Sequence, residues 1–378
     1  MRLIKFLPFV FLLAGCQDDD GVRTPDGFFD CESIASSWSA QSNAYLVFHY
    51  PQDITFISAN DAVAVSRSGQ ISRSSDGGRT WTVTETYWNG TVANENATTR
   101  ARLWTVQAIN GDLIYAAGED EDDRRFDGDI ETDAVFLTSA DGGRSWDKRY
   151  ATGLSGISDI RFIDADQGFA LGAPNENPAD QRIWLFATED GGESWNPTTL
   201  AYDRLASPKF LDRPEAVSHV VKINTQDEYA LLTLNTLDGT WAESPLPDNA
   251  QYTVRFVTRD FGTAVNHEGL WVTEDGGTTW TLRQQEVVSA GTLLYLSDEE
   301  NWLAINRITK IETGGGEAWE VLLYYEVSET KDGGTTWETR KVAKDCDYVN
   351  SFNGLVVRTP DNGFLTVASR SNLIRFMN

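Results

Sequence analysis

The side chains best suited to chemistry are carboxylates crowded into one segment of the chain. Acidic residues fill positions 119–123, and four more follow within ten positions. Oxygen ligands at this density can hold Ca²⁺, with Asp120, Asp122, Asp127 and Asp129 as the candidate ligands. The segment lacks the spaced Asp/Asn/Gly register of a known calcium loop. We therefore expect a solvated acidic loop, with calcium as the alternative and no other cofactor.

A second acidic group lies at 164–168, where Asp164 and Asp166 are separated by one residue. Its spacing also suggests calcium. Asn60, Asp61 and Asp260 occupy the same place in two similar segments of the chain. The repetition favours an ordinary turn over a metal site.

Three cations, Arg161, Lys222 and Arg255, fall at matching positions of three successive segments. Such a set could form a cationic ridge near the centre of the fold and bind a carboxylate or phosphate. Neutralisation by neighbouring acids is the alternative, because the formal net charge is −26. That charge also disfavours nucleic acid as a partner.

Aromatic residues in or beside the long loops are further ligand-binding candidates. Tyr87, Trp88 and Trp319 could stack on sugar rings or anchor a protein partner. Local packing is the alternative for each of them.

The elements that must position these side chains follow from a repeat. Five ungapped segments share the pattern Ser/Thr-x-Asp-Gly-Gly-x-Ser/Thr-Trp, and a shortened copy ends at Trp241. Two glycines supply the positive φ of a tight hairpin, the Asp accepts hydrogen bonds from turn amides, and the Trp begins the next strand. The Asp and Trp of the five copies are Asp76 and Trp81, Asp141 and Trp146, Asp190 and Trp195, Asp275 and Trp280, and Asp332 and Trp337.

Upstream of these copies, pairs of short apolar strands flank a turn, as in 54–65 and 160–171. A third strand precedes each copy and the Trp opens a fourth. Four strands in each unit of about 48 residues predict an all-β chain that forms a single β-propeller.

The end of the chain bears on the number of blades. The last unit, from 356 onward, lacks a fourth strand, which the segment 44–50 would supply. We expect seven four-stranded blades with three-plus-one closure, because such closure leaves no open sheet edge. The compressed repeat at 218–247 makes six blades the alternative.

The repeated turn resembles the Asp-box (BNR) repeat of sialidases, sortilin-type receptors and the photosystem II assembly factor family. The resemblance implies that each box closes the hairpin between the third and fourth strands of a blade, away from the functional face. The likeness to the assembly factor family covers nearly the whole mature chain by blade pattern. Members of that family are non-enzymatic propellers that bind an assembling protein. This chain is far more acidic, so the specific partner does not carry over.

Long insertions place the expected functional face opposite the Asp boxes, since loops on a rigid scaffold often carry binding residues. The insertions are 85–102, 119–133, 173–182, 197–217 and 307–318.

An enzyme is the less favoured class. The chain has no Gly-x-Ser-x-Gly, no Gly-rich phosphate loop and no His-Glu-x-x-His. Its likeness to sialidases is confined to the boxes, because the Arg-Ile-Pro motif is missing. We expect a binding or scaffold protein for a protein or glycan ligand, and a monomer. The alternative is a carbohydrate-active enzyme, a glycoside hydrolase of sialidase-like propeller type.

The first residues predict export. A short cationic start and an apolar run of eight residues end in Leu-Ala-Gly-Cys16, which resembles a bacterial lipobox. We expect a lipoprotein signal peptide at 1–15, a lipidated Cys16 with an acidic tether at 16–43, and the propeller at 44–378. The expected location is the cell envelope, anchored to the outer membrane, with the cell surface and the periplasm both open.

The two remaining cysteines form an even pair in an oxidising compartment. Cys31 and Cys346 could form a disulfide that ties the N-terminal segment to the last part of the chain. Two separate thiols are the alternative.

Overall fold

The computed structural model describes part of the chain, in which the ordered elements are β-strands. The described residues are 51–86, 101–121, 132–174, 184–198, 204–205, 210, 217–223, 229–235, 240–248, 250, 253–284, 287–288, 292–296, 298–314, 317–343, 356–358, 364–369 and 372–376. Among them, no helix has the length and apolarity needed to cross a membrane.

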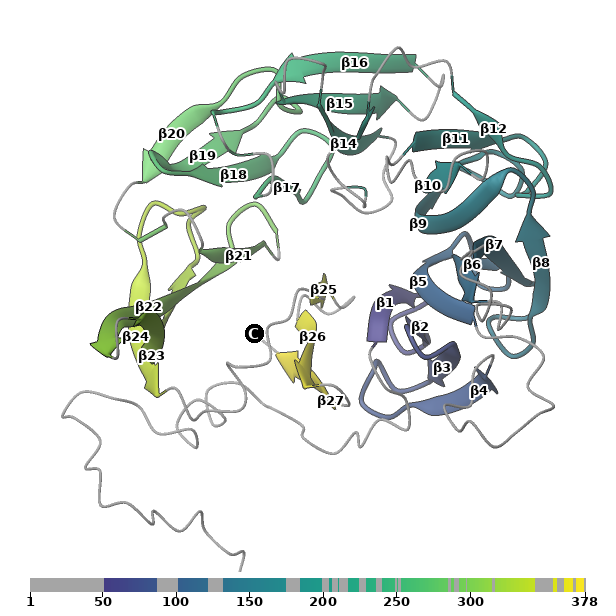
Figure 1. Ribbon diagram of the computed structural model, residues 1–378, viewed down its shortest axis with the longest axis horizontal. Helices are drawn as coiled ribbons and strands as arrows, with labels where there is room; N and C mark the ends of the chain where they lie inside the picture. Colours follow the sequence, from purple (N-terminus) through teal and green to yellow (C-terminus); the bar gives the residue numbers. More distant parts are fainter. Residues whose placement is uncertain are drawn as a thin grey trace, which may run out of the picture.

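The strands form sheets that follow one another around a ring, with the first strand of most sheets toward the middle (Figure 1). Neighbouring strands within each sheet are antiparallel. The first three sheets contain β1 (Pro51–Phe56), β2 (Ala62–Ser66), β3 (Gln70–Ser74) and β4 (Thr82–Thr86); β5 (Ala101–Ala108), β6 (Ile114–Glu121), β7 (Thr132–Ser139) and β8 (Asp147–Ala151); and β9 (Leu154–Phe162), β10 (Gly168–Pro174), β11 (Trp184–Thr188) and β12 (Asn196–Pro197).

The later sheets repeat this order along the chain. They contain β13 (Arg204–Leu205), β14 (Val217–Ile223), β15 (Tyr229–Asn235) and β16 (Thr240–Pro245); β17 (Arg255–Phe256), β18 (Gly262–Asn266), β19 (Gly269–Thr273) and β20 (Thr281–Gln284); β21 (Leu293–Leu296), β22 (Trp302–Gly314), β23 (Glu317–Thr330) and β24 (Glu338–Ala343); and β25 (Val356–Arg358), β26 (Phe364–Ser369) and β27 (Asn372–Phe376).

The single all-β propeller is confirmed, but the predicted blade composition is wrong. Within the described residues, six sheets have four strands and the last has three. Seven four-stranded blades are therefore not observed, and neither are six blades. The closing strand predicted at 44–50 lies outside the described residues. The repeat at 218–247 was expected to be shortened, but its strands belong to a complete four-stranded sheet. The fourth strand is the short β13, which precedes this segment and pairs with the end of β14.

The hydrophobic core lies between successive sheets. The second strands β2 and β18 are buried along their whole length, since neighbouring sheets cover both of their faces. Between the second and third sheets, Phe136 of β7 lies 5.7 Å from Trp195 and 5.8 Å from Phe162, measured between ring centroids. The Trp that follows a box therefore packs against the preceding sheet, which is the role that its size predicts.

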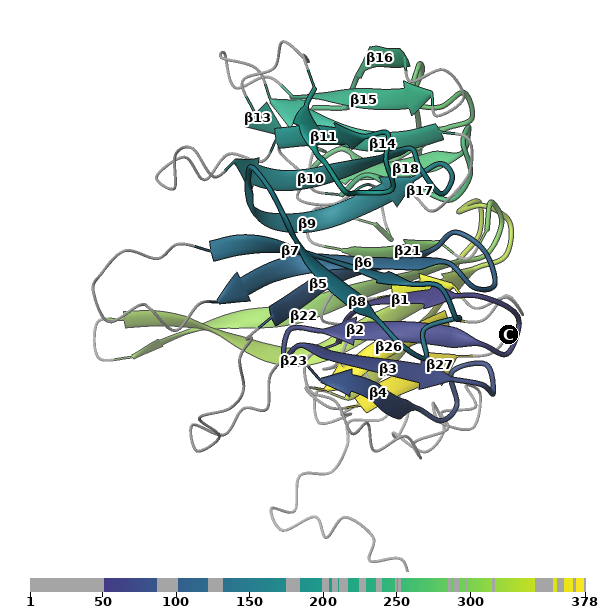
Figure 2. The same ribbon diagram turned by 90° about the vertical axis from the view of Figure 1, so that its right-hand side faces the viewer.

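A projecting two-stranded hairpin corrects one predicted insertion. Residues 307–318 were expected to form a loop, but β22 and β23 continue through most of this segment, pairing from Trp302↔Thr330 to Gly314↔Glu317. With 13 and 14 residues, these strands are more than twice as long as β18 and β19, which have 5 each. Figure 2 shows the hairpin extending beyond the neighbouring sheets.

Candidate functional site

Each of the five repeated turns uses its aspartate to hold the turn itself. In the third turn, Asp190 Oδ1 accepts hydrogen bonds from the Thr188 hydroxyl at 2.8 Å and the Ser194 amide at 2.9 Å. The Ser194 hydroxyl donates to Oδ2 at 2.5 Å. These bonds, led by that of the Ser194 hydroxyl, lower the pKa of Asp190 to about 2. The other four aspartates make the same bonds and also have lowered pKa values.

The repeated turns also define one face of the ring. The amide of Gly191 donates to the Asp166 carbonyl at 2.8 Å, which joins the third box to the turn between β9 and β10 of its own sheet. The same bond occurs in the other four sheets that carry a box. Boxes and first-hairpin turns therefore share a face, called here the box face. The opposite side, called the connection face, carries the turns at 67–69, 152–153 and 267–268.

The turn at 164–168 has the hydrogen bonding of an ordinary turn. Asp164 Oδ1 accepts the amides of Asp166 at 2.9 Å and Gln167 at 2.7 Å. This geometry agrees with the turn that the sequence favoured over a calcium site.

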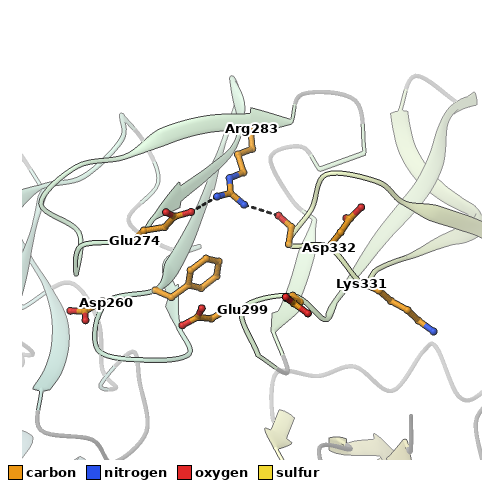
Figure 3. A pocket seen from close by; sticks show the side chains of 9 residues that line it. Asp260, Glu274, Arg283, Glu299, Lys331 and Asp332 are labelled. Atoms are coloured by element: carbon orange, nitrogen blue, oxygen red, sulfur yellow. Dashed lines mark hydrogen bonds and ion pairs between the residues drawn. The ribbon is translucent and has the colours of Figure 1, made fainter.

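A cleft of about 510 Å³ lies on the box face between the sheets β17–β20 and β21–β24. Arg283 of β20 forms an ion pair with Glu274 and donates to the Gly333 carbonyl of the next box at 3.1 Å. Figure 3 shows Arg283 above the cleft, between Glu274 and Asp332. Five acids against two cations make the lining net negative; it comprises Asp260, Phe261, Glu274, Arg283, Glu299, Glu300, Lys331, Asp332 and Gly333.

Side chains on the innermost strands link each sheet to the next. The hydroxyl of Thr55 on β1 accepts the Ala108 amide of β5 at 3.1 Å. Gln107 of β5 forms two bonds with Phe162 of β9, accepting its amide at 2.7 Å and donating to its carbonyl at 2.9 Å. Sequence patterns did not single out Thr55 or Gln107. The one feature that could have indicated them is that each directly follows a buried apolar residue of its strand, Ile54 or Val106.

Two aspartates on the innermost strands form a second set of hydrogen bonds between successive sheets. Asp53 Oδ2 accepts the Val106 amide at 2.9 Å, and Asp159 Oδ2 accepts the Phe210 amide at 2.8 Å. The Thr105 hydroxyl lies 3.3 Å from Asp53 Oδ2 and 2.7 Å from Asp159 Oδ1. These inner carboxylates therefore serve as links between sheets.

Arg161 and Arg255 occupy equivalent positions on β9 and β17, as the sequence predicted. Arg161 is buried, with its guanidinium 5.7 Å from the Phe210 ring centroid. Arg255 is solvent-accessible. Enough protein surrounds it that desolvation lowers its pKa, against an opposing effect of Tyr295. Burial raises the pKa of Tyr295 to about 12.

The third member of the predicted ridge lies elsewhere in its sheet. Lys222 is on β14, which is the second strand because β13 precedes it. Lys222 therefore does not share the first-strand position of Arg161 and Arg255, on which the predicted ridge depends. Tyr87 and Trp88 lie outside the described residues. Trp319 lies on β23, opposite Glu312 in the strand register.

The predicted acidic loop is only partly described. Asp120 lies at the end of β6 and is buried, with the Lys148 ammonium at 2.6 Å and the Tyr150 hydroxyl at 2.8 Å from Oδ2. Asp122, Asp127 and Asp129 lie outside the described residues, as do Cys16, Cys31 and Cys346. Within the described ranges, no group of three or more His, Cys, Asp or Glu residues could hold a metal ion.

The hairpin of β22 and β23 extends from the connection face and contains 307–318, one of the insertions expected on the functional face, although its paired strands were not expected. Two of the large apolar side chains exposed in the described structure lie on it: Ile311 is 76% exposed and Leu323 is 39% exposed. The signal was present in the sequence, since β-branched and aromatic residues flank the glycines at 314–316.

Comparison with known proteins gives a fold but no family. No protein-family model matches the sequence, and neither does any curated protein. The structure is similar to that of YCF48 bound to a D1 peptide, with a TM-score of 0.60 and 14% identity over 94% of this chain and all of that one. YCF48 from Cyanidioschyzon merolae gives 0.56 and 16%, over 87% of this chain and 95% of that one. The WD40 propeller domain of Doa1 gives 0.47 and 12%, over 90% and 97%.

Proposed function

We propose that this chain is a non-enzymatic scaffold that binds a partner protein at its connection face. The observation that carries the proposal is the long hairpin of β22 and β23, which extends from that face and exposes Ile311. Rigid sheets behind an exposed apolar projection are a common arrangement for binding another protein. One structure of similar fold is that of YCF48 bound to a D1 peptide, which supports the same class of function.

The box face is the less suitable binding surface. The box carboxylates are occupied by hydrogen bonds within their own turns, as at Asp190. The Arg283 guanidinium already binds Glu274 and the Gly333 carbonyl, so it holds two sheets together. Groups satisfied in this way have little left to offer a ligand.

Photo-crosslinking from one sheet tests the choice of face. A photoreactive amino acid replaces His267, exposed in the β18–β19 turn of the connection face, or Thr278, exposed in the box of the same sheet. We expect protein adducts in intact cells from position 267 and few from position 278. Equal labelling, or adducts only from 278, would contradict the proposal. Binding of the protein to a glycan array tests the alternative that its ligand is a glycan. An assay for sugars released from the same array tests the alternative that the protein is a glycoside hydrolase.

We also propose that the repeated turns are Asp boxes and that the chain is a lipoprotein of the cell envelope, anchored to the outer membrane through Cys16. The lipobox-like Leu-Ala-Gly-Cys16 and the box pattern support this proposal. The variant Cys16→Ser should move the protein from the membrane fraction to the soluble fraction. A variant that stays with the membrane would argue against lipid anchoring.

A further inference from the structure

Three sheets carry a basic residue where the second strand reaches the connection face. The residue is Arg67 in the first sheet, His267 in the fifth and Arg307 in the sixth, and all three side chains are exposed. Arg307, at the start of the long hairpin, matches His267 in position. The residues before them, Asn306 and Asn266, both donate from Nδ2 to a carbonyl of the connection that precedes their sheet, at 2.8 and 2.7 Å. We call these three basic residues the basic arc.

The basic arc belongs to one side of the ring. Figure 1 shows the last sheet, β25–β27, between the sixth sheet and the first. Its sequence has Arg370 directly after β26, flanked by serines as Arg67 is after β2. Arg370 lies outside the described residues, so only its place in the sequence is used. In the second and third sheets the matching residues are Glu119 and Ala173, which each follow the residue paired with the bulge of the first strand. The series of basic residues therefore runs through consecutive sheets and stops at the second.

The two arginines of the basic arc are available to an acidic ligand. Among the described residues, neither Arg67 nor Arg307 forms an ion pair, in a chain whose net charge is −26. The Arg67 guanidinium lies 5.7 Å from the ring centroid of Trp104 on the next sheet. A guanidinium stacked on an aromatic ring keeps its N–H groups in its own plane, where they bind carboxylate oxygens in pairs. Arg67 is therefore held in position for a carboxylate.

We infer that the basic arc binds an acidic segment of the partner protein, with carboxylates of that segment paired to Arg67 and Arg307. A carboxylate fits both the guanidinium fork and the imidazole N–H of His267. A nucleic acid or an anionic membrane presents a wider field of negative charge, which would also meet the acids of this surface, such as the exposed Glu268. A short acidic segment can contact the arc alone. This inference names the chemistry of the partner and rests on the proposed function.

The test uses full-length protein and a labelled peptide in which glutamate alternates with serine. Fluorescence anisotropy measures binding at low and at high salt, and hydrogen exchange of the protein amides locates it. A protein of net charge −26 repels this peptide overall, so that binding requires a local basic site. We expect binding that weakens with salt and slows exchange at 67–69 and 267–269. No binding at low salt would overturn the inference, and so would slowed exchange on the box face alone.

Charge-reversed variants separate the basic arc from the overall charge of the protein. Arg67→Glu and Arg307→Glu should each weaken binding of the peptide about three-fold, and the double variant about ten-fold. Arg307→Lys keeps the charge and should keep most of the affinity, which a misfolded protein would not. The matched control Lys331→Glu makes the same charge change on the box face, where Lys331 is exposed and forms no ion pair with a described residue. We expect wild-type affinity from the control, and an equal loss in the control and the arginine variants would overturn the inference.

The two proposals can fail independently. Photo-crosslinking from position 267 is repeated in the double variant Arg67→Glu/Arg307→Glu, where we expect the protein adducts to be lost. If the adducts persist, the partner binds the connection face without the basic arc, and only the inference is wrong. If the peptide binds at the arc while position 267 gives no adducts in the otherwise unchanged protein, the basic site exists and the proposed binding of a partner protein at this face is wrong.

Discussion

Replacing the second glycine of the third box measures how strongly a repeated turn depends on the neighbouring sheet. Gly192 has φ of 82°, and a Cβ added there would lie 2.6 Å from Phe136 Cε1. Phe136 is fully buried, with the rings of Tyr115 and Trp195 at 5.2 and 5.7 Å, so it has no space to move away. The left-handed backbone costs about 1–2 kcal/mol. Overpacking of the core adds about 1–3 kcal/mol.

The variant Gly192→Ala should therefore lose about 2–5 kcal/mol of the free energy of unfolding. With a guanidinium m-value of about 5 kcal/mol/M for a chain of this size, a loss of 3 kcal/mol lowers the midpoint by about 0.6 M.

A second glycine isolates the packing contribution. Gly153 has φ of 87°, and no atom lies within 4 Å of an added Cβ. Gly153→Ala should show only the backbone cost, partly offset by its effect on the unfolded chain, so that its net loss is about 1 kcal/mol. Both variants are measured by guanidinium unfolding followed by tryptophan fluorescence. Equal losses for the two variants would refute the packing argument, since only Gly192 faces an aromatic ring.

Three further predictions concern other parts of the chain. Gln107→Ala should lose about 2–4 kcal/mol of unfolding free energy, because it leaves the buried Phe162 amide and carbonyl unpaired; an unchanged denaturation midpoint would contradict this. Because the pKa of Asp190 is lowered to about 2, its contribution is complete above the unfolded pKa of about 3.8 and is lost as pH falls toward 2. The denaturation midpoint should therefore fall between pH 5 and pH 2.5 by less in Asp190→Asn than in wild type. An equal fall in both proteins would contradict this prediction. Non-reducing mass spectrometry should find a linked Cys31–Cys346 peptide; two alkylatable thiols would show that the bridge is missing.

The repeated turns were predictable because their chemistry is local. Asp, two glycines and a hydroxyl at fixed spacing specify the turn by hydrogen bonds within about eight residues. The third strand expected before each copy is observed, for example as β3 before the first copy and β19 before the fourth. Elements whose evidence lies in nearby residues are the ones that sequence reasoning recovers.

The failures concern pairing between distant residues. β13 has two residues and exists only because it pairs with the end of β14, so no periodicity could indicate it. Because β13 was not expected, Lys222 was predicted to lie near the centre of the fold together with Arg161 and Arg255. The long hairpin was read as an insertion because it exceeds the length of its counterparts. The bonds of Gln107 depend on a neighbouring sheet, and its type alone gave no hint of them.

The hairpin of β22 and β23 also has a mechanical consequence. Its register shifts between Ile308 and Thr309, and such a bulge locally bends a ribbon. The six residues from Thr309 to Gly314 reach about 20 Å beyond that point, at about 3.4 Å per residue. A rotation of about 10° at the bulge would then move the tip by about 3.5 Å, roughly one residue along a strand. The ring can stay rigid while the projecting hairpin changes its angle, so its tip reaches a range of positions relative to the ring.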